Sequence, residues 1–134
     1  MKTKRILAIA CLMCLFCLGG CAPLLIGGAA IGAGSGTYMY VNGELRVEYN
    51  APFEKVRTAC EMAIAELGGK EVVPDWKIGV GTIKTRIQNE KVKLTIEYKT
   101  KEATVLSIRV GYIGNKQSSQ LIKDKVSDYL IKNQ

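Results

Sequence analysis

The sequence feature that most limits what this chain can fold into is the distribution of its charged residues. Lys2, Lys4 and Arg5 lie near the beginning, and no further charged residue occurs up to Val41, whereas the remainder has an ordinary globular mixture. A folded domain needs both an apolar core and a charged surface. A chain of 134 residues therefore has room for one modest domain, which we expect at 43–134.

The first 20 residues have the three-part order of an export signal. Residues 2–5 are basic, and residues 6–18 form an uncharged apolar run that is shorter than the ~20 residues needed to span a bilayer. Small residues then precede Cys21, as signal-peptide cleavage requires. We expect residues 1–20 to be removed as a signal peptide, with cleavage between Gly20 and Cys21.

The residues around Cys21 resemble the bacterial lipobox. That resemblance implies that Cys21 receives a diacylglycerol thioether and that its new amino group is acylated after cleavage. Two or three acyl chains anchor a protein stably where one chain does not, so the membrane is an expected partner. Ala22 stands where inner-membrane lipoproteins typically have Asp, which favours the periplasm-facing leaflet of the outer membrane. An ordinary secretory signal with an incidental cysteine is the alternative.

Residues 21–42 contain no charge and are rich in glycine and alanine. Gly28, Gly32 and Gly36 recur at every fourth position, a spacing that lets helices pack closely within lipid. One interpretation is therefore a membrane-inserted helix or hairpin. The other is a flexible tether, because glycine disfavours an isolated helix. We expect the tether, since the lipid on Cys21 already supplies an anchor.

From residue 43 onward, apolar residues recur at spacings that predict strands and helices. Pro74 interrupts a short strand expected at 71–73, and Asn50 and Asn115 are expected to cap the two helices. In chain order, we expect a strand at 45–49, a helix at 53–67, the short strand, strands at 80–88, 91–99 and 103–112, and a helix after Asn115.

The order β-α-β-β-β-β-α predicts an α+β fold. Short connections at 89–90 and 100–102 favour an antiparallel meander. An antiparallel sheet of four to five strands with two helices on one face would bury every apolar stripe, which gives a two-layer sandwich. The other face of the sheet is then left bare.

Basic residues alternate along the three strongest expected strands. If alternate residues point outward, the bare face has five cations and Glu97 as the main countercharge. Such a face suits an anionic lipid head, lipopolysaccharide or glycan. The alternative is that an uncovered antiparallel face is rich in lysine for solubility. The expected basic face consists of Lys84, Arg86, Lys91, Lys93 and Arg109.

Enzymatic function is disfavoured by the residue types that are present. The chain has no histidine, no G-x-S-x-G motif and no spaced carboxylate cluster, so we expect no catalytic residue, metal site or cofactor.

The formal net charge of +7 falls to +4 without the expected signal peptide, and a charge of +4 is too small for a nucleic-acid interface. Cys60 lies on an apolar helical stripe and is expected to be buried. Trp76 is either a core residue or an exposed contact.

Residues 107–115, Ser-Ile-Arg-Val-Gly-Tyr-Ile-Gly-Asn, precede the last expected helix. Together with the glycine-rich stretch after Cys21 and Gly-Glu-Leu at 43–45, they resemble a family of small, mostly Gram-negative lipoproteins known only as a domain of unknown function. That family has the pattern I-R-V-G-x-x-G-D, and Asn115 replaces its Asp. Both residue types cap helices. The resemblance implies an envelope lipoprotein, with no known activity.

Two functions are expected from these observations. The first is a non-catalytic envelope lipoprotein with a structural or assembly role toward a protein partner or peptidoglycan. The alternative is a binding module for an anionic lipid, lipopolysaccharide or glycan. The oligomeric state is not determined by the sequence.

Overall fold

The computed structural model of the chain describes residues 37–133. The expected signal peptide, its cleavage site, Cys21 and most of the expected tether lie outside the described residues. The elements in chain order are β1 (Thr37–Val41), β2 (Glu44–Tyr49), α2 (Phe53–Glu66), β3 (Lys70–Lys77), β4 (Val80–Ile87), β5 (Glu90–Thr100), β6 (Ala103–Val110) and α3 (Lys116–Lys132).

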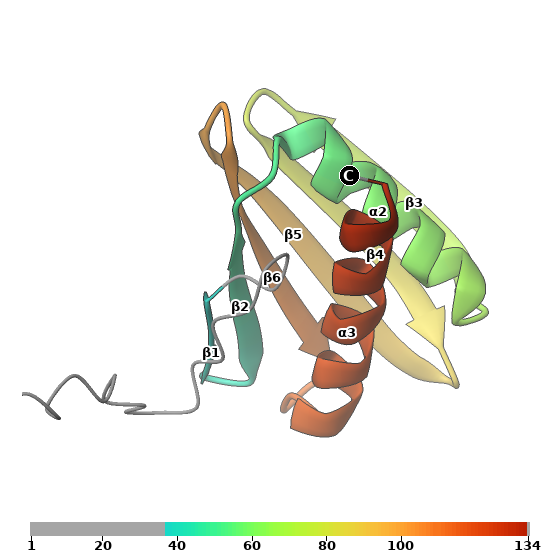
Figure 1. The fold of residues 1–134 in the computed structure, drawn as a ribbon. Coiled ribbons are helices and arrows are strands. Elements are labelled where there is room, and N and C mark those ends of the chain that lie inside the picture. Colours follow the sequence, from blue (N-terminus) through green and yellow to red (C-terminus); the bar gives the residue numbers. More distant parts are fainter. Residues whose placement is uncertain (1–36, 134) are drawn as a thin grey trace, which may run out of the picture.

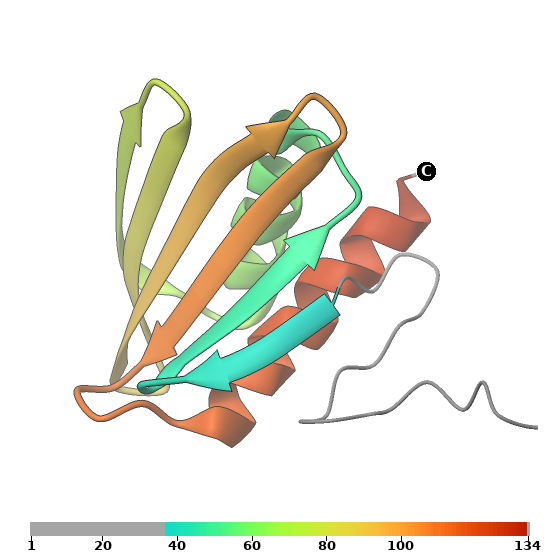
Figure 2. The ribbon, with the colours of Figure 1, turned by 90° about the vertical axis from the view of Figure 1, so that its left-hand side faces the viewer.

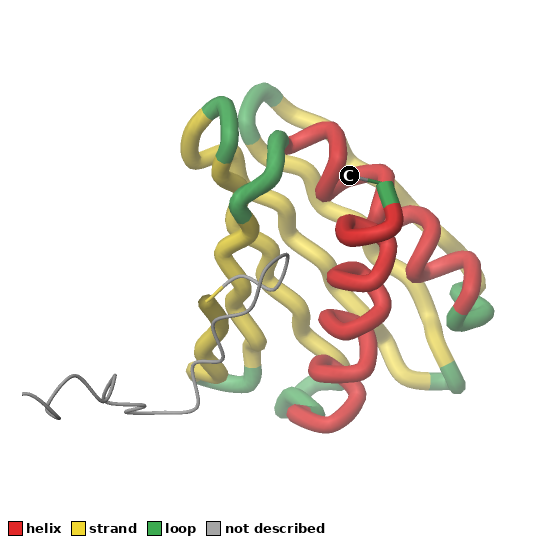
Figure 3. The backbone as a smooth tube through the Cα atoms, in the orientation of Figure 1, coloured by secondary structure: helices red, strands yellow, loops and turns green. Residues whose placement is uncertain are grey.

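The strands form one antiparallel sheet in the spatial order β1-β2-β6-β5-β4-β3. Both helices pack against the same face of this sheet (Figures 1 and 3), and in the turned view the strands lie in front of the helices (Figure 2). The expected α+β class and antiparallel sheet are confirmed. The described part of the chain has six strands rather than four to five, in the order β-β-α-β-β-β-β-α.

The additional strand is β1, which lies in the range expected to be a tether. Asn42 and Gly43 have φ values of 52° and 80°, the conformation that a two-residue type I′ hairpin turn requires. Asn-Gly is the residue pair most typical of that turn, so the segment folds back onto β2. Tyr38 and Tyr40 pack against the core from β1. The folded domain therefore begins before residue 43.

The strand β3 is longer than the short strand expected at 71–73, because it continues through Pro74. It lies at the edge of the sheet, where half of the backbone N–H groups point away from any neighbouring strand. A proline in that position removes no essential bond of the sheet. Trp76 follows on β3, opposite Gly81 on β4.

The core lies between the helices and the inward side chains of the sheet. In α3 the buried stripe includes Ser119, Ile122 and Val126, so Leu121 lies off the stripe and is 48% exposed. The buried hydroxyl of Ser119 donates a hydrogen bond to the carbonyl oxygen of Asn115 at 2.8 Å. The largest fully buried side chains include Tyr49, Leu45, Ile83, Leu94, Ile96, Leu106 and Ile108.

The two helices begin differently. The side-chain oxygen of Asn115 accepts a hydrogen bond from the backbone N–H of Ser118 at 3.2 Å, as expected. The helix α2 instead begins after Pro52, with no side-chain cap, so the expected cap by Asn50 is wrong. The fixed φ of proline suits the start of a helix and brings no N–H that needs a partner.

These caps lead to a first prediction. Asn115→Ala should lower the free energy of unfolding by about 1 kcal/mol, because it leaves a helix N–H without its partner. The measurement is urea denaturation followed by circular dichroism. Asn50→Ala is the matched control and should change the stability little. Equal losses in the two variants would contradict the assignment of the caps.

Candidate binding site on the bare face of the sheet

The strand register brings the five expected cations together on the face that the helices leave bare. Lys93 on β5 lies directly opposite Lys84 on β4 and Arg109 on β6. In the next row, Arg86 lies opposite Lys91. All five line one concavity of about 410 Å³. We call these five residues the basic cluster.

The basic cluster is unfavourable for the stability of the sheet. Unlike charges that face each other across two strands stabilise a sheet by about 0.2–1 kcal/mol, whereas directly opposed like charges destabilise it. Here three directly opposed pairs are all cationic. Surface lysines that only confer solubility need no such alignment, and they are normally interspersed with acids.

Neighbouring acids neutralise the basic cluster only in part. Arg109 lies 3.2 Å from the carboxylate of Glu44 and donates to the carbonyl oxygen of Asn42 at 3.0 Å. Arg86 makes a long ion pair of 3.9 Å with Glu71. Among the described residues, no carboxylate lies within 4.0 Å of the ammonium groups of the other three cations, Lys84, Lys91 and Lys93. The lining of the concavity therefore has five cations and one acid.

Tyr112 completes one side of the concavity. The ammonium of Lys91 donates a hydrogen bond to the Tyr112 hydroxyl at 2.7 Å and lies 5.0 Å from the ring centroid. This hydrogen bond, and then the charges of Lys91 and Arg86, lower the pKa of Tyr112. The backbone N–H of Gly111 donates to the carbonyl oxygen of Lys91 at 2.7 Å, which holds the start of this loop against β5.

Glu71 and Tyr112 are the site residues that the sequence pattern missed. Glu71 has a φ of 53° in an irregular stretch of β3, so its side chain does not follow the alternation of a regular strand. Tyr112 lies beyond the end of β6 as the structure defines it. It comes three positions after Arg109, so strand alternation assigns its side chain to the opposite face and gave no signal for it.

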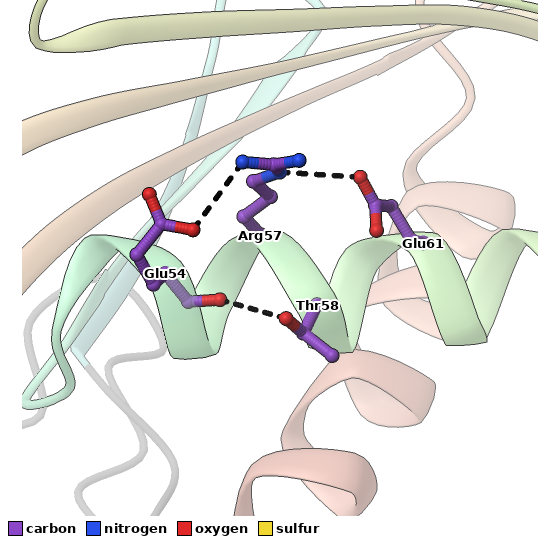
Figure 4. A network of polar contacts seen from close by, with 4 residues as sticks. All are labelled: Glu54, Arg57, Thr58 and Glu61. Atoms are coloured by element: carbon purple, nitrogen blue, oxygen red, sulfur yellow. Dashed lines mark hydrogen bonds and ion pairs between the residues drawn. The ribbon is translucent and has the colours of Figure 1, made fainter.

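Trp76 belongs to a different part of the molecule. It is half-buried, packs against the core and fills the space beside Gly81. Arg57 lies 4.5 Å from its ring centroid. Figure 4 shows how Glu54 and Glu61 hold that guanidinium, each at 3.3 Å. Of the two alternatives for Trp76, a core residue or an exposed contact, this packing agrees with the first.

Other groups that could carry chemistry do not form a second site. Cys60 is fully buried, and burial raises the pKa of its thiol. In residues 37–133, no three cysteine, aspartate or glutamate side chains gather in a way that could hold a metal ion. Neither of the two described helices is long and apolar enough to cross a membrane.

The fold and site define a class: a small two-layer α+β domain with a basic, uncovered sheet face. The chain belongs to the family described as a protein of unknown function, DUF3568, which matches residues 4–129. The expected resemblance to a family of unknown function is thereby confirmed, and its description carries no activity. No curated protein matches the sequence significantly.

Proposed function

We propose that this chain is a lipid-anchored envelope protein that binds an anionic envelope component, without catalysis, on the bare face of its sheet. The observation that carries the proposal is the alignment of three like-charged pairs across β4, β5 and β6. Such an arrangement lowers stability in the free protein, and an anionic ligand relieves the repulsion. A phosphate or sulfate group in the concavity would meet several cations at once.

The location is proposed from the amino-terminal sequence. A basic segment, an apolar run and small residues before Cys21 support export and acylation. Ala22 in the next position supports the outer membrane, in the leaflet that faces the periplasm. Lipid on Cys21 would hold the domain beside anionic lipid heads and the glycans of the periplasm.

A structural or assembly role toward a protein partner is the second candidate function. The edge strand β3 has Pro74 and an irregular register, which are features that hinder the addition of another strand. The opposite edge strand, β1, has no charged residue and no proline. This difference favours β1 as the edge at which a protein partner would add a strand.

The binding proposal is tested with inorganic pyrophosphate and the full chain in neutral detergent micelles. Isothermal titration calorimetry should detect binding, and Lys84→Gln should weaken it about fivefold, because one charge contact at 4 Å in water contributes about 1 kcal/mol. Lys55→Gln on α2 is the matched control and should bind like the unaltered chain. No binding by the unaltered chain, or equal affinity in both variants, would refute the proposal.

A further inference from the structure

The loop between β6 and α3 exposes two large apolar side chains at one end of the sheet. Tyr112 is 80% exposed and Ile113 is 91% exposed. Gly111 and Gly114 flank them, with φ values of 74° and 99°. We call residues 111–114 the tip.

The backbone of the tip is held in place by the turn between β1 and β2. A Cβ added to Gly114 would overlap the Cα and carbonyl oxygen of Gly43. A Cβ added to Gly43 would overlap the carbonyl oxygen of Ile113. The two backbones therefore touch at a distance that only glycine permits. Tyr112 and Ile113 are therefore exposed on a loop whose backbone packs against the rest of the domain.

Cations surround the tip. A second concavity of about 760 Å³ borders the first and shares Arg86, Lys91, Gly111 and Tyr112 with it. Its lining also includes Lys116 and one acid, Glu90. Three cations thus accompany the exposed tyrosine and isoleucine at one end of the domain.

This combination of groups matches the chemistry of a bilayer surface. Tyrosine favours the boundary between lipid heads and acyl chains, an aliphatic side chain enters the acyl boundary, and lysine and arginine lie near anionic head groups. A soluble anion would need the cations but not the two exposed apolar side chains. An apolar protein groove would need the apolar side chains but would disfavour the surrounding charges.

We propose that the tip docks on an anionic bilayer, with Tyr112 and Ile113 in the interface and the basic cluster facing the lipid phosphates. This inference rests on the proposed function, since it names the bilayer as the anionic component. The expected lipid anchor on Cys21 leaves enough chain for the tip to reach the bilayer. The segment from Cys21 to Thr37 can span at most about 55 Å. The longest strand, β5, has 11 residues and is about 37 Å long, so the segment is long enough to reach from one end of the sheet to the other.

The test uses tryptophan as a depth probe in the full chain. Ile113→Trp places the probe on the tip, and Ile78→Trp is the matched control. Ile78 is fully exposed in the turn between β3 and β4, at the opposite end of the sheet. The chain has one native tryptophan, Trp76, and the fluorescence of the unaltered chain measures its contribution. Each chain is reconstituted in equimolar phosphatidylcholine and phosphatidylglycerol, with or without brominated acyl chains.

Brominated lipid should quench the added fluorescence of Ile113→Trp several-fold more strongly than that of Ile78→Trp. The difference should shrink in vesicles of phosphatidylcholine alone, because the anionic head groups are gone. Equal quenching at the two positions, or none at position 113, overturns the inference. A blue shift at position 113 without bromine quenching indicates a protein contact and overturns it as well. Pyrophosphate binding by the same variants separates this failure from failure of the proposed function.

Discussion

Gly114→Ala should lower the free energy of unfolding by about 3 kcal/mol. The new Cβ would overlap backbone atoms of Gly43, which cannot move aside as the end of a flexible side chain can. The φ of 99° adds strain, because residues with a Cβ rarely adopt that conformation. Overpacking and backbone strain each contribute about 1–3 kcal/mol at such positions. Urea denaturation followed by circular dichroism measures the change.

Gly111→Ala is the control for this prediction. Gly111 also has a positive φ, 74°, but a Cβ there would meet no atom within 4 Å. Its loss should be about 1 kcal/mol, from backbone conformation alone. Similar losses in the two variants would show that close packing against the β1–β2 turn does not hold the tip. Gly114→Ala should also reduce the lipid quenching of the tip probe if the variant stays folded.

Lys93→Glu should change binding and stability in opposite directions. The substitution alters the charge in the middle of the basic cluster by two units, so pyrophosphate affinity should fall about 30-fold, at about 1 kcal/mol per unit. The same change converts two repulsive cross-strand pairs, with Lys84 and Arg109, into attractive ones. The free energy of unfolding should therefore rise by about 1 kcal/mol.

Calorimetry and urea denaturation of the same preparation check both parts of this prediction. Lys93→Gln, which removes one charge without reversing it, should weaken binding about fivefold and raise stability by a smaller amount. A variant that binds less and is also less stable would indicate damage to the fold. A variant that is more stable but binds equally would indicate that the basic cluster has no ligand of this kind.

Strand alternation was enough to predict that the five cations share one face. It works for β4, β5 and β6 because each strand has one buried side where the cations occur, so a period of two is preserved along that part of the sequence. Which cations face each other depends on the turns. Gln88 and Asn89, with φ values of 48° and 70°, place the turn between β4 and β5 one residue earlier than expected. That turn sets the pairing of Arg86 with Lys91.

The strands β1 and β3 could not be predicted in the same way. The length of β3 depends on its place at the edge of the sheet, where Pro74 is tolerated because one side of the strand has no neighbour. The strand β1 lies in an uncharged stretch whose composition suits a tether as well as a strand. Its Asn42-Gly43 turn was the available signal, and pairing with β2 decides the outcome.

The sequence alone determined the α+β class, the antiparallel order of the central strands, the cap at Asn115 and the membership of the basic cluster. These follow from local periodicity and local hydrogen bonding, which neighbouring residues control. Only the tertiary structure decided the opposition of like charges, the place of Glu71 and Tyr112 beside them, and the packed tip. Each depends on contacts between segments far apart in the chain, such as Gly43 with Gly114. Those contacts exist only once the strands have paired and the sheet is complete.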